Sequence, residues 1–229
     1  MKAAIRVQLV PDAAGIAADT DAVAIDVLRA TTTLTVALAN GAGPVTPVAT
    51  PAGALALRER QPGSLACGER GGRMVAGFDL GNSPFEYGAE RVGGRPLIFA
   101  STNGSHAMIA AARAKRRWLG AFVNAGAIVE ALAGAAHVTL VCAGKLGRPA
   151  LEDAACAGWL CAALEARGAT LEGAGARFAR RLAPADAAAV AALVAACPHA
   201  RELVALGPAY MRDLEFCGTL DVVERAFTL

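Results

Sequence analysis

The stretch AIDVLRATTT, residues 24–33, brings together residue types that bind phosphate and metal ions. Asp26 lies inside an apolar run, where a carboxylate suffers a large desolvation cost unless it binds a cation or another partner. Arg29 suits bidentate phosphate contacts, and the hydroxyls of Thr31, Thr32 and Thr33 open a helix whose free amide groups favour anions. The stretch predicts an anion cradle beside a metal ligand. The alternative is an internal Asp26–Arg29 ion pair with ordinary threonine caps.

A second stretch, CGERGGRMVAGFDLGNSP at residues 67–84, combines acidic and amide side chains with five glycines. Glu69 follows an apolar strand, and Asp79 and Asn82 lie in the loop beyond it. Two carboxylates and an amide are hard oxygen ligands that suit Mg²⁺, and glycine lets the backbone approach a ligand closely. A plain surface turn with capping Asp and Asn is the alternative.

Two more junctions between a strand and a helix are polar. In FASTNGSHA, residues 99–107, Thr102, Asn103 and Gly104 suit an oxyanion, although helix capping explains the same residue types. In LVCAGKLGRPALEDAACAG, residues 140–158, Glu152 and Asp153 open a helix, where acids favour the positive end of its dipole. Successive helical residues differ by about 100° in direction, so we expect only one of these two acids to face a metal ion.

These four junctions together predict a Mg²⁺-dependent site for a phosphoryl group, because a cation and several donors share the charge of the transferring group. Other nucleotide and hydrolase signatures are absent from the sequence. It has no GxxxxGK[ST] loop, no GxGxxG after a strand and no GxSxG elbow. It also lacks the second acid of the DxD strand end that is typical of haloacid-dehalogenase-type phosphatases.

The elements that must position these residues alternate along the chain. Short apolar runs typical of buried strands are followed by segments with helical periodicity, which predicts a layered α/β/α protein with a largely parallel or mixed sheet. In such sheets ligands bind beyond the carboxyl ends of the strands. The expected strands are 22–28, 45–49, 64–69, 96–101, 118–123 and 137–144, and the expected helices are 31–42, 51–60, 103–115, 125–134 and 150–168.

Beyond residue 168 the pattern becomes helical through RFARRLAPADAAAVAALVAA, residues 177–196. The end, AYMRDLEFCGTLDVV at 209–223, is interpreted as an element that returns to the body of the protein. Residues 1–229 are expected to form a single α/β phosphatase domain, or two small lobes that share a core.

Composition excludes several classes of protein. The chain has 22 basic and 20 acidic residues, a net charge of +2 and 5% aromatic residues, with no basic stripe, so we expect no nucleic-acid partner. We also expect no membrane partner and a cytoplasmic location, because no apolar run reaches the length of a spanning helix and the amino terminus lacks a signal sequence. The six cysteines form no CxxC pair and are expected to be buried thiols. The sequence leaves the oligomeric state open, including a homo-oligomer.

In order and spacing, these stretches resemble the signatures of the 2-phosphosulfolactate phosphatase family. The resemblance rests on IDVLRATTTLTVALANGA, CGERGGRMVAGFDLGNSP, STNGSHA and CAGKLGRPALEDAACAG, and covers about residues 22–160, with a weaker match at DLEFCGTLDVV. It implies an α/β phosphatase that uses Mg²⁺ to hydrolyse 2-phosphosulfolactate to 3-sulfolactate and phosphate. In methanogens this reaction belongs to coenzyme M biosynthesis. The third motif departs from the family's usual TTNGT followed by Thr or Arg, because Ser101 and Ser105 replace the two outer threonines and His106 replaces the residue after them.

The resulting hypothesis is a Mg²⁺-dependent phosphatase acting on a small anionic phosphoester. Asp26, Arg29, Glu69 and Asp79 are the expected catalytic residues, and the metal ligands are expected among Asp26, Glu69, Asp79, Glu152 and Asp153. The expected substrate-binding residues are Thr31, Thr32, Thr33, Arg70, Asn82, Thr102, Asn103, Gly104 and Lys145. The alternatives are a phosphatase for another 2-phospho-carboxylate and a non-catalytic sensor of a phosphorylated or sulfonated metabolite.

Overall fold

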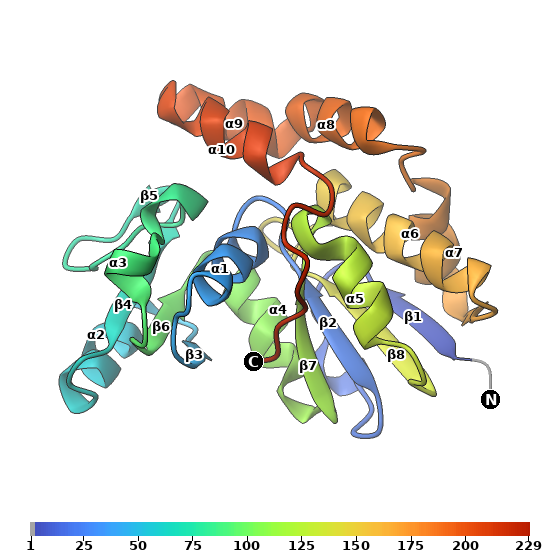
Figure 1. Ribbon diagram of the computed structural model, residues 1–229, viewed down its shortest axis with the longest axis horizontal. Coiled ribbons are helices and arrows are strands. Elements are labelled where there is room, and N and C mark those ends of the chain that lie inside the picture. Colours follow the sequence, from blue (N-terminus) through green and yellow to red (C-terminus); the bar gives the residue numbers. More distant parts are fainter. Residues whose placement is uncertain (1–2) are drawn as a thin grey trace.

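Two sheets form the framework of the protein in the computed structural model, which describes residues 3–229 (Figure 1). The larger sheet has five parallel strands in the order β7-β2-β8-β1-β9. Strand β2 pairs with the edge strand β7 on one side and with the middle strand β8 on the other, so its end is flanked by strands on both sides. The strands are β1 (Ala4–Gln8), β2 (Asp21–Ile25), β7 (Arg116–Gly120), β8 (His137–Cys142) and β9 (Thr170–Leu171).

The smaller sheet has four strands in the order β3-β6-β4-β5. Three of them are parallel, and β5 turns back antiparallel to β4 as a short hairpin. The strands are β3 (Val45–Pro47), β4 (Leu65–Arg70), β5 (Arg73–Met74) and β6 (Leu97–Ala100). The expectation of a layered α/β fold with largely parallel pairing is confirmed, and the structure adds that the strands divide between two sheets.

Helices separate and cover the two sheets (Figure 1). One apolar cluster joins α1 and α4 to the facing sides of both sheets, and a second joins the other face of the larger sheet to α5, α6 and α8–α10. A third places α2 against the outer face of the smaller sheet. The helices are α1 (Ala30–Ala39), α2 (Pro51–Arg60), α3 (Ala89–Val92), α4 (Gly104–Ala110), α5 (Ala125–Ala131), α6 (Leu151–Ala166), α7 (Gly173–Arg181), α8 (Ala187–Ala196), α9 (Pro198–Leu206) and α10 (Ala209–Cys217).

Local sequence explains where the carboxyl-terminal helices begin and end. The alanine-rich run at residues 177–196, where the sequence predicts helix, is split between α7 and α8. Pro184 lies in the break, where proline disfavours helix in the preceding residue, and the Asp186 side chain then caps α8 by accepting the Ala189 amide at 2.8 Å. This break lets α8, α9 and α10 cross over the carboxyl ends of the strands (Figure 1).

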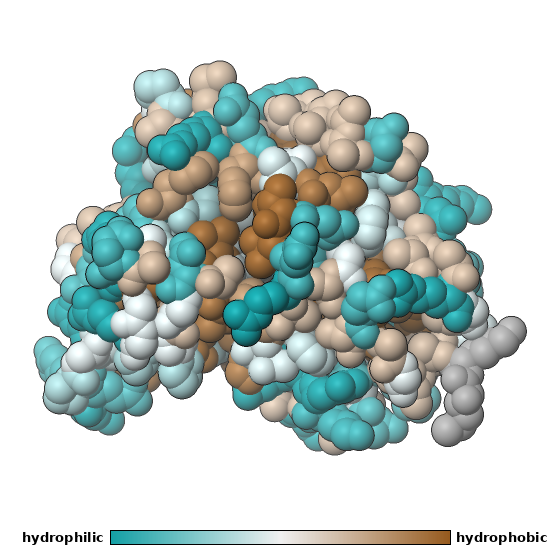
Figure 2. Space-filling model, viewed as in Figure 1, coloured by the Kyte–Doolittle hydropathy of each residue, from teal (hydrophilic) through white to brown (hydrophobic). Residues whose placement is uncertain are grey.

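The last residues of the chain return to the larger sheet, as the sequence indicated. The amide groups of Asp221 and Val223 donate to the carbonyl groups of Phe122 and Val123 at 3.0 and 2.8 Å, and Thr228 forms a bridge with Trp118. Figure 2 shows hydrophobic surface gathered over the middle of this face, around α1 and the carboxyl-terminal segment, with hydrophilic residues toward the margins. Most of helix α1 is nevertheless buried, and only its last turn reaches the surface.

Within residues 3–229, no individual helix combines the length and the apolar character that a bilayer crossing requires. Helices α8 and α9 meet those criteria only when taken together, and they are bent by 60° at their junction.

Candidate active site

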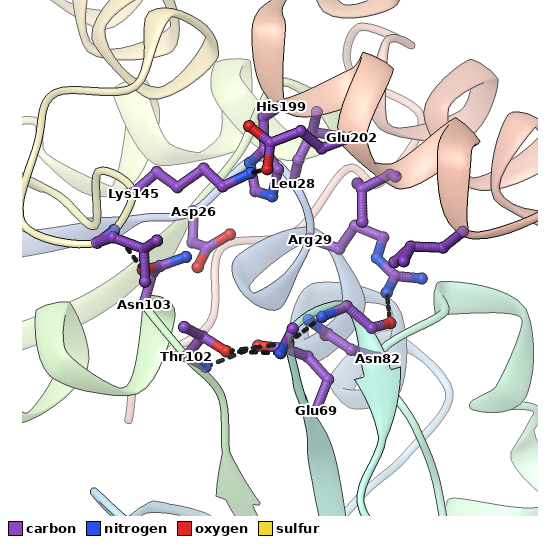
Figure 3. Close-up of a pocket in the computed structure, with 15 residues that line it drawn as sticks. Asp26, Leu28, Arg29, Glu69, Asn82, Thr102, Asn103, Lys145, His199 and Glu202 are labelled. Carbon is purple, nitrogen blue, oxygen red and sulfur yellow. Dashed lines mark hydrogen bonds and ion pairs between the residues drawn. The ribbon is translucent and has the colours of Figure 1, made fainter.

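A pocket of about 200 Å³ lies where the carboxyl ends of strands from both sheets face α9 (Figure 3). Parallel strands present their carboxyl ends at one edge, so residues far apart in sequence converge there. The pocket floor comes from β2, β4 and β6 and the loops after them, and α9 forms the roof. Its polar lining comprises Asp26, Arg29, Glu69, Asn82, Thr102, Asn103, Lys145, His199 and Glu202.

Asp26 lies directly after β2 and is only 5% exposed. Its Oδ1 accepts the Ala30 amide at 3.2 Å, so the carboxylate itself caps α1. Burial raises the pKa of Asp26 to about 6, while His199 and the Ala30 amide oppose this rise and the negative charge of Glu69 adds to it. A carboxylate of this kind is poised to bind a cation, which would remove its desolvation cost.

Gly104 allows α4 to begin beside this carboxylate. A Cβ at residue 104 would lie 2.5 Å from Asp26 Oδ2 and 2.4 Å from the Ala30 Cβ, closer than any side chain tolerates. The predicted importance of Gly104 therefore has a steric basis. The residue makes room for Asp26, and it does not itself line the pocket.

Glu69 at the end of β4 connects the two loops below the pocket. Its Oε1 accepts the Thr102 amide at 2.7 Å, and its Oε2 accepts the Gly72 amide at 2.7 Å and the Thr102 hydroxyl at 3.1 Å (Figure 3). A carboxylate has about four lone-pair directions, so these three bonds fix its orientation and leave one direction for a ligand. Glu69 and Thr102 thus lie in the pocket as the sequence predicted.

Arg29 lines the pocket, but its ion-pair partner is Asp213 on α10. Its second terminal nitrogen donates to the Gly72 carbonyl at 2.9 Å, and the guanidinium lies 4.8 Å from the centre of the Tyr210 ring. Asp213 also accepts the Ser83 hydroxyl at 2.6 Å. The alternative of an Asp26–Arg29 pair is therefore wrong, and Arg29 holds the roof helices to the floor of the pocket.

The three threonines after Arg29 do not reach the pocket. Thr31 donates to the Gly120 carbonyl at 2.7 Å, Thr32 to the Val27 carbonyl at 2.9 Å and Thr33 to the Asn82 carbonyl at 3.0 Å. All three side chains are fully buried. The positions of these hydroxyls do not support the predicted cradle, because they satisfy carbonyl groups of the surrounding backbone instead.

Two predicted residues of the glycine-rich stretch also lie elsewhere. Arg70 donates to the carbonyl groups of Glu69 and Ala49, both at 2.7 Å, and does not line the pocket. Asp79 lies on the far side of β4, where its Oδ2 accepts the Ala66 amide at 2.8 Å and pairs with Arg58 at 3.1 Å. The prediction that Asp79 is a metal ligand is therefore not supported by its position.

Replacing Asp79 with asparagine distinguishes a metal ligand from a residue that only pairs with Arg58. If the reaction requires Mg²⁺, as the sequence predicts, we expect the Asp79→Asn variant to need no more Mg²⁺ than the wild-type protein. It should lose about 1 kcal/mol of unfolding free energy because the Arg58 pair is weakened. Urea unfolding measures the second quantity, and a Mg²⁺ titration of activity measures the first. If the Asp79→Asn variant needs a much higher Mg²⁺ concentration for activity, Asp79 is a metal ligand after all.

Glu152 and Asp153 begin α6 and face different partners. Asp153 accepts the Val27 amide at 2.9 Å and the Gly144 amide at 3.0 Å, which ties together the loops after β2 and β8. Burial raises the pKa of Asp153 well above its usual value, and these two amide bonds oppose the rise. Glu152 Oε1 lies 2.9 Å from His199 Nδ1. Neither acid lines the pocket, so their positions do not support the prediction that one of them binds metal.

Within residues 3–229, no group of three or more His, Cys, Asp or Glu side chains is arranged to hold a metal ion. Mg²⁺ nevertheless binds proteins through one or two carboxylates and keeps several waters for the substrate phosphate to replace. Asp26 and Glu69 supply two carboxylates in the pocket, and the buried Asn82 Oδ1 has no hydrogen-bond partner. This donor set fits a partly hydrated Mg²⁺.

The remaining predicted residues lie at the mouth of the pocket. Asn103 Oδ1 accepts the Leu146 amide at 2.9 Å, which leaves the Asn103 side-chain amide NH₂ available. Lys145 forms an ion pair with Glu202 on α9 across the pocket (Figure 3). Both residues can donate to an anionic ligand, as the sequence predicted.

The whole roof of the pocket was missed from the sequence. His199, Glu202, Leu203 and Leu206 of α9 all line it, and Asp213 anchors the next helix. Their spacing offered a signal, because residues separated by three, four and seven positions lie on one helical face. No feature of the sequence indicated which part of the protein this face would contact.

Comparisons with known proteins identify the family of this chain. The profile of the 2-phosphosulpholactate phosphatase family matches residues 7–229. A probable 2-phosphosulfolactate phosphatase of Thermotoga petrophila is 40% identical over 208 residues, which cover 91% of this chain and 88% of the relative. Proteins with the same description from a Synechococcus species and from Deinococcus radiodurans are each 43% identical, over 207 and 178 residues. They cover 87% and 76% of this chain, and 84% and 73% of their own lengths. The chain therefore belongs to the 2-phosphosulfolactate phosphatase family of phosphoric monoester hydrolases.

Proposed function

We propose that this protein hydrolyses 2-phosphosulfolactate to 3-sulfolactate and phosphate in a Mg²⁺-dependent reaction. The observation that carries the proposal is the buried Asp26 carboxylate at the end of β2, which lines a pocket bordered by cationic and amide donors. Membership of the family supports the substrate, and the size of the pocket, about 200 Å³, suits a small molecule.

The residues available to hold Mg²⁺ are Asp26, Glu69 and the Asn82 amide oxygen. When bound, Mg²⁺ neutralises phosphate charge and activates water as a nucleophile. The buried Asn82 oxygen supports this proposal, because an amide oxygen without a partner in the interior is costly unless a ligand satisfies it.

Lys145 and Asn103 are proposed to bind the anionic groups of the substrate. Lys145 faces the pocket while paired with the mostly exposed Glu202, so a substrate anion can replace that partner at small cost. Asn103 presents its side-chain amide NH₂ at the same edge. Arg29 is fixed by Asp213 and the Gly72 carbonyl, so its role is to orient the pocket walls and to supply positive charge.

A cytoplasmic location is part of the proposal. All six cysteines are unpaired and buried, which suits a reducing compartment.

The experiment measures phosphate release from 2-phosphosulfolactate and from 2-phospholactate, with Mg²⁺ or with a chelator. We expect the highest kcat/KM with 2-phosphosulfolactate, at least about a 100-fold loss with chelator, and recovery when Mg²⁺ is returned. Preference for 2-phospholactate would replace the proposed substrate and keep the reaction. Binding of both compounds without phosphate release would identify a sensor and contradict the proposal.

A further inference from the structure

A histidine and a buried acid form a pair at the roof of the pocket. His199 Nδ1 lies 2.9 Å from Glu152 Oε1, and Glu152 is 1% exposed. The His199 side chain is 14% exposed and lines the pocket. Figure 3 shows His199 directed from α9 into the pocket above Asp26. The pair therefore links the interior of the protein to the space where a substrate would bind.

The pairing fixes which ring nitrogen faces the pocket. A carboxylate accepts hydrogen bonds, so Nδ1 carries the proton shared with Glu152, and Nε2 is the ring atom left for a ligand. Burial alone raises the pKa of Glu152, but the hydrogen bond with His199 brings it below its usual value. Glu152 is thus held as a carboxylate beside the ring, where its hydrogen bond with Nδ1 fixes the orientation of the imidazole.

The second oxygen of Glu152 strengthens this interpretation. Glu152 Oε2 is buried and has no hydrogen-bond partner among the described residues. A buried acid with an unsatisfied oxygen lowers the stability of the fold. If Glu152 served only to pack α6, an apolar residue at this position would be more stable. The side chain is explained by its contact with His199.

We infer that His199 Nε2 protonates the leaving oxygen of the substrate, and that Glu152 is a positioning residue that orients the imidazole. This inference rests on the proposed phosphatase function and adds a proton donor to it. The leaving group of 2-phosphosulfolactate is an alkoxide, which is too basic to depart efficiently without a proton.

The step balances in atoms and charge. Water forms the new bond to phosphorus, and the bond between phosphorus and the ester oxygen breaks with its electron pair remaining on that oxygen. The ester oxygen takes the Nε2 proton and becomes the hydroxyl of 3-sulfolactate. The attacking water keeps one proton as the phosphate hydroxyl, and its other proton returns through solvent to His199.

Charged groups from several elements surround His199. Asp26 faces it from β2, Glu69 from β4 and Lys145 from the loop after β8, while Glu152 and Glu202 come from α6 and α9. Lys145 could also donate a proton, but it is on a flexible stem and its ammonium is held by Glu202. The His199 ring is fixed at Nδ1, which favours it as the directed donor.

The test compares substrates whose leaving groups differ in their need for a proton. The His199→Asn variant keeps a side-chain NH near Glu152 and removes the Nε2 proton. We expect its kcat/KM with 2-phosphosulfolactate to fall about 100-fold or more, and its kcat/KM with acetyl phosphate, which releases a stable carboxylate, to fall less than about 10-fold. Glu152→Gln should show the same selective loss at smaller size, and imidazole added to His199→Ala should restore part of the lost rate.

The matched control is His106→Asn, because His106 is exposed on α4 and does not line the pocket. It should leave both substrates unaffected. Equal losses on both substrates in His199→Asn, or no loss on either, would overturn the role of His199 while wild-type turnover still supported the phosphatase. Absence of phosphate release by the wild-type protein from both substrates would overturn the proposed function and the inference with it.

Discussion

Replacing Asp26 with asparagine is expected to lower kcat/KM at least about 1,000-fold and, at pH 8, to raise the free energy of unfolding by about 1–3 kcal/mol. The activity falls because the cation and the phosphate lose the buried carboxylate in the pocket. The stability rises because the folded protein no longer holds a desolvated negative charge. Activity assays and urea unfolding at one pH measure the two effects together.

The sign of the stability effect follows from proton linkage. The pKa of Asp26 is about 6 in the folded protein and 3.8 in the unfolded chain, so between these values the folded state binds more protons. Stability of the wild-type protein therefore falls as pH rises from about 4 to about 6, and the cost is fully present above this window. The Asp26→Asn variant should gain nothing at pH 3.5 and its full amount at pH 8.

The ionisation of Asp26 also predicts how kcat/KM depends on pH on the acid side of the profile. Since the proposed cation requires the carboxylate form, kcat/KM of the wild-type protein at low Mg²⁺ should rise tenfold per pH unit below about pH 6 and stop rising above it. Saturating Mg²⁺ should move this limb to lower pH, because the cation competes with the proton. A profile that is flat from pH 4.5 to 7 would contradict the assignment.

Asp21 provides the control for Asp26. It lies at the other end of the same strand and is equally buried, but Arg116 pairs with both of its oxygens at 2.6 and 2.7 Å. Asp21→Asn should therefore lower the free energy of unfolding at pH 8, opposite in sign to Asp26→Asn, and should leave catalysis unchanged. A loss of stability in both variants would indicate that the Asp26 charge is compensated within the fold.

Replacing Asp213 with alanine should lower the free energy of unfolding by about 3–5 kcal/mol, since it leaves the buried Arg29 guanidinium without its counter-charge. The Ser83 hydroxyl also loses its partner. Because α10 continues the roof of the pocket, substrate affinity should fall as well. Urea unfolding and KM measure these two consequences.

Glu215→Ala is the matched control, because Glu215 is exposed on the same helix. It should change stability by no more than about 0.5 kcal/mol. A double variant, Arg29→Met with Asp213→Leu, should recover much of the stability lost in Asp213→Ala, because neither charge remains buried alone. Recovery of stability without recovery of activity would separate the structural role of this pair from its role in the pocket.

The alternation of strands and helices could be predicted from sequence because it is local. Buried parallel strands such as β2 are apolar apart from an acid at one end, and helix α2 opens with a Thr50 cap followed by Pro51. The division into two sheets could not be predicted, because strand partners are chosen by contacts between distant segments. The two-residue β5 and β9 are too short to leave a periodic pattern.

The sequence predicts a site residue's place in the pocket when its position at the end of a strand is enough to determine that place. Asp26, Glu69, Thr102, Asn103 and Lys145 follow strands whose carboxyl ends meet at one edge, and all line the pocket. Which way a side chain points is decided by its neighbours. For that reason the sequence does not reveal that Asp79 pairs with Arg58, or that the threonine hydroxyls donate to nearby carbonyl groups. His199 depends on how α9 crosses the sheets, which no local pattern specifies.

The carbonyl group of Gly72 accepts hydrogen bonds from both Arg29 and Tyr210, each at 2.9 Å. One peptide oxygen thereby sets the spacing between the smaller sheet, the larger sheet and the helices above them. Because every amino acid carries this atom, mutation at residue 72 cannot delete the acceptor, although a Cβ there would lie 2.5 Å from Leu206 Cδ1. Divergence toward other substrates is therefore expected to keep the spacing set by this carbonyl group and to change the side chains at the mouth of the pocket.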